Sequence, residues 1–154
     1  MLNAQALYAE LKPQIGAVAN ELFTLSEAFL RDQGNFLPHG AVLTSDGAIR
    51  LVAADPGNGD SEARSTEVMP LLHYGLREQA TSEVAAVAVA ENVTVTLEGQ
   101  PSTSAIKVLF EHRDGLAVAL YLPFDVQPGG TYAFGTVFSK VAEPEVGAWQ
   151  NGVA

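Results

Sequence analysis

The chain has 154 residues, of which 47% are hydrophobic and 17% charged, so it is long and apolar enough to bury one core. Eight lysines and arginines against eighteen aspartates and glutamates give a formal net charge of −10. This charge argues against binding to nucleic acid or to anionic membranes, because both depend on cationic side chains. The absence of cysteine excludes disulfides, thiolate metal sites and thiol nucleophiles.

The N-terminal residues and the apolar runs indicate a cytoplasmic protein. No cationic residue precedes Lys12, so we expect no signal peptide. Apolar runs such as residues 84–90 and 116–124 are far shorter than the roughly 20 residues that a membrane helix needs.

Residues 2–31 have the spacing of a long amphipathic helix. Apolar residues recur every three or four positions, at Leu7, Leu11, Ile15, Val18, Leu22, Leu25 and Phe29. Pro13 predicts a kink, or a short helix followed by a longer one. Gly34 and Asn35 mark the end of the helix.

The next segment predicts a β-hairpin and a second helix. In "GAVLTSDGAIRLVAAD", residues 40–55, two β-prone runs flank Asp46-Gly47, which favours a tight turn. Residues 61–80 then read as a helix with Val68, Leu71, Leu72 and Leu76 on one face. Pro70 would mark a restart of this helix.

From Glu83 onward the apolar residues alternate with a period of two, which predicts consecutive antiparallel strands. Asp114-Gly115 signals another tight turn, and the "QPGG" of residues 127–130 precedes a last strand carrying Tyr132, Phe134 and Phe138. We expect residues 143–154 to be loosely held, with Trp149 as their only anchor.

These elements predict a single α+β domain spanning residues 1–154. Its antiparallel sheet has about five to six strands, and the two amphipathic helices need one face of the sheet to lie against.

The cluster "EHRDG" is the first candidate site. Glu111 and His112 are adjacent in a strand and point to opposite faces, so the composition favours the tip of a hairpin. Glu111 and Arg113 share a face and could bind a polar group. With His39, in the loop "FLPHG", and Tyr121, these residues are our candidates for ligand binding: His39, Glu111, His112, Arg113 and Tyr121.

We predict no catalytic residue, no cofactor and no metal. His39, His73 and His112 lack the spacing of a helical ligand pair. The loop "DPGNGDSE" offers oxygen donors at Asp55, Asn58, Asp60 and Glu62, but it departs from the spacing of a calcium-binding EF-hand loop. It reads as a connector, with Asp60 or Ser61 capping the second helix. Neither a nucleophile elbow nor a phosphate-binding glycine loop occurs.

The hairpin followed by a helix and an antiparallel meander resembles profilin-like and roadblock-type domains. In these, a "G-[AV]-x-[LV]-x-x-[DE]-G" hairpin precedes the helix, which here matches Gly40, Ala41, Leu43, Asp46 and Gly47. The chain also resembles small bacterial α+β proteins of unassigned activity, through "GAVL…DG" and "EHRDG". The long N-terminal helix and a further strand depart from the roadblock pattern. The resemblance implies a scaffold that dimerises and binds other proteins.

Three functions remain open from the sequence. The first is a non-catalytic cytoplasmic interaction or accessory module that forms a homodimer. The second is a small-molecule-binding sensory domain with a pocket between sheet and helix, lined by Phe36, Tyr121, Tyr132 and Phe134. The third is a small acid–base enzyme that uses His39 or His112 with the carboxylate of Glu111 or Asp46.

Overall fold

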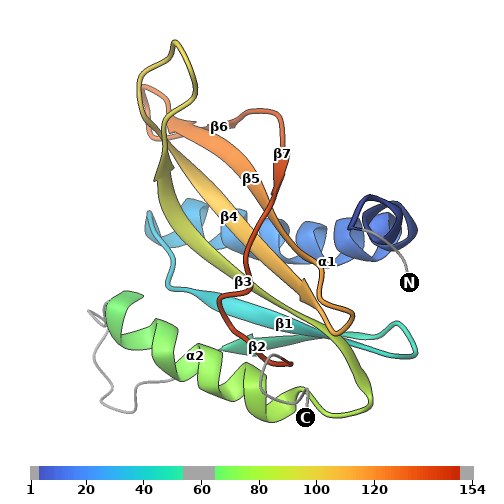
Figure 1. Cartoon of the computed structure of the whole chain (residues 1–154). Coiled ribbons are helices and arrows are strands. Elements are labelled where there is room, and N and C mark those ends of the chain that lie inside the picture. Colours follow the sequence, from blue (N-terminus) through green and yellow to red (C-terminus); the bar gives the residue numbers. More distant parts are fainter. Residues whose placement is uncertain (1–3, 54–64, 150–154) are drawn as a thin grey trace.

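The computed structural model describes residues 4–53 and 65–149 and confirms an α+β fold (Figure 1). The helices are α1 (Ala4–Gln33) and α2 (Ser65–Gln79). The strands are β1 (His39–Thr44), β2 (Ile49–Ala53), β3 (Val84–Val95), β4 (Thr103–His112), β5 (Ala117–Val126), β6 (Tyr132–Phe134) and β7 (Phe138–Val141). The predicted connector at residues 55–62 lies outside the described residues.

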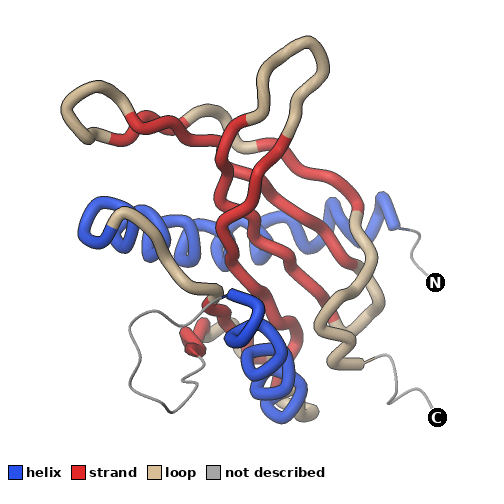
Figure 2. Tube along the Cα trace, turned by 90° about the vertical axis from the view of Figure 1, so that its left-hand side faces the viewer, coloured by secondary structure: helices blue, strands red, loops and turns tan. Residues whose placement is uncertain are grey.

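All seven strands belong to one antiparallel sheet. Its order is β2-β1-β3-β4-β5-β6, and β7 pairs with β5 beyond the end of β6. The predicted turn of the β1–β2 hairpin is confirmed: Gly47 has φ 96, and its N–H donates to the Thr44 carbonyl at 3.0 Å. The longest hairpin, β3–β4, projects beyond both helices (Figure 2).

Helix α1 forms because its apolar stripe lies on the sheet. The stripe residues Leu7 to Leu22 are buried against β1, β3 and β4. Pro13 lies inside the helix with its ring on the exposed side, and the helix continues across it, so α1 is not a short helix followed by a longer one. Gly34 ends the helix with φ 78, and its N–H donates to the Leu30 carbonyl at 2.9 Å. Among residues 4–53 and 65–149, no helix is long and apolar enough to cross a membrane.

The two helices lie on opposite faces of the sheet, so the expectation that both share one face was wrong. In Figure 1, α1 passes behind the strands, whereas α2 lies in front. Residues 84–90 of β3 are all buried; alanines at 86, 88 and 90 face α1, and valines at 87 and 89 face α2. A strand that is apolar on both faces needs a cover on each.

Gly40 allows α2 to approach β1 closely. A Cβ atom added at this position would lie 2.6 Å from the Ala88 carbonyl oxygen and 3.2 Å from Leu76 Cδ1. Only glycine fits there without displacing the neighbouring backbone. The first residue of the "GAVL" motif is thus required mainly by the close approach of the β3 backbone, and Leu76 of α2 adds a weaker constraint.

The predicted last strand is divided into β6 and β7 by one extra residue. Phe134 pairs with Phe124, whereas Phe138 pairs with Tyr121, so the register shifts by one between them. Phe134 therefore packs on the α1 face with Phe124, and Phe138 stacks on Tyr121 on the other face. An unbroken strand would have placed Phe138 on the same face as Phe134.

Candidate functional site

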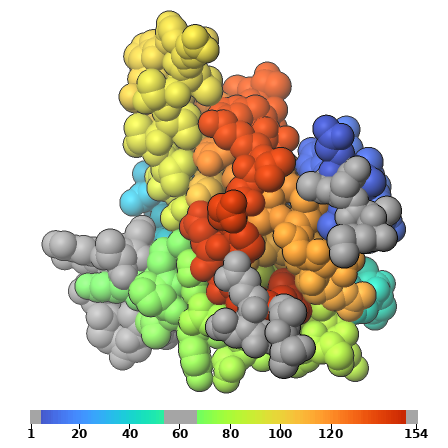
Figure 3. Space-filling model, viewed as in Figure 1, coloured from blue at the N-terminus to red at the C-terminus, as the bar shows by residue number. Residues whose placement is uncertain are grey.

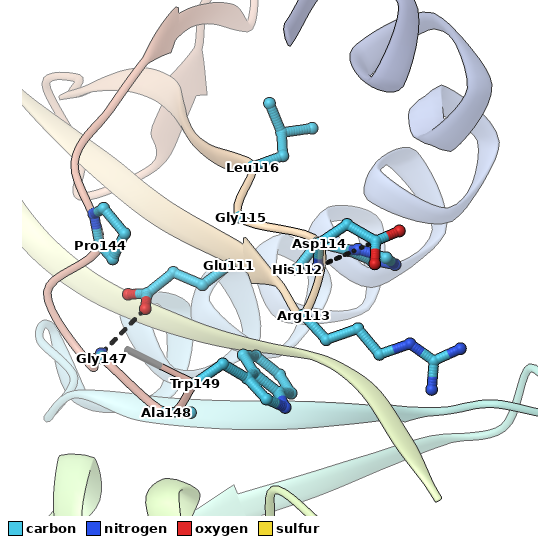
Figure 4. A pocket seen from close by; sticks show the side chains of 10 residues that line it. All are labelled: Glu111, His112, Arg113, Asp114, Gly115, Leu116, Pro144, Gly147, Ala148 and Trp149. Atoms are coloured by element: carbon cyan, nitrogen blue, oxygen red, sulfur yellow. Dashed lines mark hydrogen bonds and ion pairs between the residues drawn. The ribbon is translucent and has the colours of Figure 1, made fainter. Parts of the chain in front are cut away.

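The cluster "EHRDG" is a tight turn between β4 and β5, as predicted. The His112 N–H donates to the Leu116 carbonyl at 2.8 Å, and the Gly115 N–H donates to the His112 carbonyl at 2.9 Å. Gly115 adopts φ 100, which favours glycine. Figure 4 shows Glu111 directed toward Gly147 and His112 on the other side of the strand, beside Asp114.

The Glu111 carboxylate holds the chain near its C-terminal end. Its side chain is buried, with 3% of the residue exposed, and faces α2. Its Oε2 accepts the N–H groups of Glu145 at 2.9 Å and Val146 at 2.8 Å, and its Oε1 accepts that of Gly147 at 3.0 Å. Gly147 has φ 69, a conformation that helps successive N–H groups point to one anion.

Residues 143–149, which we call the C-terminal strap, are therefore not held by Trp149 alone. Val146 is 2% exposed and packs in an apolar cluster with Leu72 and Val87. Its carbonyl accepts a hydrogen bond from Arg77 Nη1 at 3.1 Å. Figure 3 shows the strap crossing the face of the sheet beside α2. The strap thus fills a groove between α2 and the strands, which we call the strap groove.

Lys107 adds an electrostatic contact to the strap. Its Nζ donates to Glu145 Oε2 at 3.1 Å and lies 3.7 Å from Glu91 Oε1. Burial lowers the pKa of Lys107, but the hydrogen bond to Glu145 and the charges of Glu145 and Glu91 outweigh it, so the pKa lies above its ordinary value. The ammonium group therefore stays charged while it holds the strap.

A pocket of about 430 Å³ opens between the β4–β5 turn and the strap. Glu111, His112 and Arg113 contribute to its lining, together with Pro144 and Trp149 (Figure 4). Three of the five candidate residues are thus brought together. All three already bind protein groups, because Glu111 holds the strap, Arg113 Nη1 donates to Ser45 Oγ at 3.0 Å, and His112 accepts a backbone N–H.

His112 is buried and held in its neutral form. Its Nδ1 accepts the Asp114 N–H at 3.0 Å, and Asp114 Oδ2 lies 3.6 Å from the same nitrogen. Burial lowers the pKa of His112 more than the Asp114 charge raises it. Near neutral pH the pair is therefore no ion pair, and the Nδ1 lone pair is engaged in closing the turn.

His39 lies elsewhere on the α1 face. Its ring lies between Phe29 and Phe36, with Nδ1 donating to the Leu37 carbonyl at 3.0 Å and Nε2 3.1 Å from Ser26 Oγ. Burial lowers the pKa of His39, although the hydrogen bond to Leu37 acts in the other direction. Its partner Ser26, whose hydroxyl oxygen also lies 2.8 Å from the Leu22 carbonyl oxygen, was missed from the sequence. A serine within the apolar stripe of α1 was the available signal.

The two histidines are well separated. His39 pairs with Ala90 and His112 with Ala86, four residues apart along β3. That spacing corresponds to about 13 Å at 3.3 Å per residue. Neither ring is hydrogen-bonded to the carboxylate of Glu111, which faces the opposite side of the sheet, or to that of Asp46, which accepts from Thr44 in the β1–β2 turn.

Tyr121 belongs to a transverse row on the α2 side of the sheet. Strand pairing aligns Glu91, Lys107, Tyr121 and Phe138 on β3, β4, β5 and β7. The Tyr121 ring stacks on Phe138 with centroids 5.0 Å apart.

The four aromatic residues proposed to line one pocket are divided between the two faces. Phe36, Tyr132 and Phe134 pack with the α1-side cluster, whereas Tyr121 lies on the other side of the sheet. They do not surround one cavity.

His73 lies on α2, and its buried Nε2 has no hydrogen-bond partner. Within the described residues, no three His, Asp or Glu side chains gather where they could hold a metal ion.

Comparisons of the chain with protein-family models, with curated proteins and with solved structures found no match.

Proposed function

We propose that this protein is a non-catalytic, cytoplasmic interaction module that forms a homodimer by pairing of its β2 strands. The observation that carries the proposal is the position of β2 at the end of the sheet. Among residues 4–53 and 65–149, no strand pairs with its outer side. An open strand edge presents backbone groups that can pair with another chain.

The side chains of β2 suit pairing with a second copy. Leu51 is 50% exposed, and it lies opposite Ala41 on the α1 face. Antiparallel pairing centred on Leu51 would place the two Leu51 side chains together and Arg50 opposite Val52. The only charged residue of the strand would not oppose its own copy, so the arrangement avoids the repulsion of directly opposed like charges.

The state of the ionisable residues supports the non-catalytic part of the proposal. The carboxylate of Glu111 accepts three backbone N–H groups of the strap. Nδ1 of His112 accepts the backbone N–H of Asp114. Both nitrogens of His39 lie within hydrogen-bond distance of protein oxygens. Groups used in this way stabilise the fold and are not free to accept a proton from a substrate.

Light scattering during size-exclusion chromatography tests the proposal. We expect the wild-type protein to show twice the 16.2 kDa mass of the chain at micromolar concentrations. Leu51→Lys should give the mass of one chain, because two lysines would meet at the centre of the pairing. Leu71→Lys is the matched control, since Leu71 is 45% exposed on α2, and it should leave the dimer intact. A wild-type protein with the mass of one chain would refute the proposal.

Small-molecule binding is a second candidate function. The pocket beside the β4–β5 turn has a volume of about 430 Å³, within the range of roughly 300–1,000 Å³ that is usual for ligand sites. Arg113 and Trp149 offer a cation and an aromatic ring at its lining. A thermal-shift screen of common anionic and aromatic metabolites tests this candidate. A ligand of this pocket should stabilise the wild type but not Arg113→Ala, and a screen without hits would count against it.

A further inference from the structure

The C-terminal strap has the contacts of a bound peptide. It belongs to neither a helix nor a strand, and its main chain is held by side chains of the folded body. Glu111 binds three of its N–H groups and Arg77 binds the Val146 carbonyl. Recognition of main-chain N–H and C=O groups by fixed acceptors and donors is how proteins bind peptides.

The strap groove also selects side chains. Lys107 pairs with the carboxylate of Glu145, and the apolar cluster of α2 and the sheet encloses Val146. Gly147 follows with a positive φ that residues with a Cβ rarely adopt. The groove therefore fits the sequence pattern of an acidic residue, a small aliphatic residue and glycine.

We propose that the strap groove is a peptide-binding site that the chain fills with its own residues 145–147, and that residues 145–147 of a second copy can fill it instead. Every contact just described joins the strap to the body, so each would form again between two copies. Exchange of identical elements between copies therefore costs few contacts. This site is separate from β2 and does not depend on pairing at that edge.

The link between β7 and the strap is short, which favours the chain's own strap in the wild type. Only residues 142–144 separate the last residue of β7 from Glu145. Pro144 disfavours helical conformation at Glu143 and keeps this link extended. In the wild type, a short link holds the strap at an effective concentration on the order of millimolar, so the chain's own strap outcompetes a second copy at micromolar concentrations.

Two complementary variants of the full chain remove that competition. Glu111→Gln damages the groove but keeps the strap, because an amide cannot accept at both of its atoms. Val146→Asp damages the strap but keeps the groove, because a carboxylate would enter the apolar cluster. Both carry Leu51→Lys, which removes pairing through β2, and the Val146→Asp chain also carries Trp149→Phe. Trp149, the only tryptophan of the sequence, then reports on the strap of the Glu111→Gln chain alone.

Native mass spectrometry and Trp149 fluorescence are measured on each variant and on their mixture. We expect each variant alone to have the mass of one chain, and the mixture to contain a species of two chains with blue-shifted Trp149 emission. A mixture that contains only single chains and shows no spectral shift would overturn the proposal. If circular dichroism shows that Val146→Asp does not fold, Glu145→Lys replaces it, because the exposed Glu145 side chain contributes no core packing and a lysine would repel Lys107.

Discussion

The two faces of the sheet are covered in different ways. One is covered by α1, a single 30-residue helix whose apolar stripe meets mostly apolar strand residues. The other is covered by the 15-residue α2 and by the strap, with charged groups such as Lys107 and Glu111 beneath them. The α1 face is thus stabilised mainly by buried area, whereas the strap is held by a few directed contacts. Substitutions in the core of the α1 face should therefore destabilise the whole domain. Substitutions of the residues that hold the strap should release the strap and leave the rest of the domain folded.

The largest effect is expected at the centre of the α1 face. Leu22 is fully buried, so Leu22→Ala should lower the free energy of unfolding by about 2–5 kcal/mol through lost burial and the cavity left behind. Urea denaturation followed by circular dichroism measures the change. Asn20→Ala, on the exposed side of the same helix, should change stability by less than about 0.5 kcal/mol. Equal losses of unfolding free energy in Leu22→Ala and Asn20→Ala would show that the α1 face is not stabilised mainly by buried area.

A smaller and local effect is expected at Glu111. Glu111→Gln keeps the shape of the side chain but places an amide NH₂ against backbone N–H groups, which should cost about 1–3 kcal/mol. The loss should be local, with Trp149 emission shifting to the red at urea concentrations below the main circular dichroism transition. Glu21→Gln, exposed on α1, is the control and should leave both curves unchanged. If Trp149 emission and circular dichroism of Glu111→Gln change at the same urea concentration, the strap does not detach separately from the rest of the domain.

The polar groups of the α1 face should make stability depend on pH. The folded pKa values of His39 and His112 lie below their ordinary value of 6.5, so the unfolded chain binds more protons and stability falls as the pH decreases. The loss begins as the pH falls through 6.5 and levels off below the folded pKa values, with a slope of up to about 1.4 kcal/mol per pH unit for each histidine.

His112→Asn separates the two contributions. The asparagine Oδ1 can accept the Asp114 N–H in place of Nδ1, so the turn keeps its hydrogen bond without a titrating group. Urea denaturation between about pH 7.5 and pH 5 should show a shallower loss of stability for this variant than for the wild type. Parallel curves would mean that His112 titrates in the folded protein as it does in the unfolded chain.

The smallest effect is expected at the tip of the β4–β5 turn. Arg113 is exposed, and its hydrogen bond to Ser45 joins two surface turns. Arg113→Ala should change the free energy of unfolding by no more than about 0.5 kcal/mol. Chemical denaturation measures it beside Glu111→Gln, which changes a residue two positions earlier in the chain. A loss as large as that of Glu111→Gln would assign the turn a larger part in holding the strap.

Local patterns in the sequence were sufficient for most of the elements. The stripe from Leu7 to Leu22 predicted α1, and Asp46-Gly47 and Asp114-Gly115 predicted two turns, because helix faces and tight turns depend on neighbours in the chain. The side on which each helix packs depends on the whole sheet. The alternation of alanine and valine in residues 84–90 held this information, since both faces of that strand are apolar.

The strap could not be recognised in the same way. The partners of the Glu111 carboxylate are backbone N–H groups 34 to 36 residues later in the chain. Every residue except proline has such a group, so no side-chain pattern marks a segment that a carboxylate will bind. The register shift between Phe134 and Phe138 was equally hidden, because an extra residue in a strand changes neither its composition nor its length in a visible way.

That shift between β6 and β7 also limits how the sheet can grow. The extra residue interrupts the regular series of backbone groups along that edge, whereas β2 at the other end pairs in unbroken register with β1. Pairing through β2 uses the same strand on both copies and closes on itself. A filament would need the two different ends of the sheet to join, and the interrupted edge provides no continuous partner for β2. Association by strand pairing should therefore stop at two molecules.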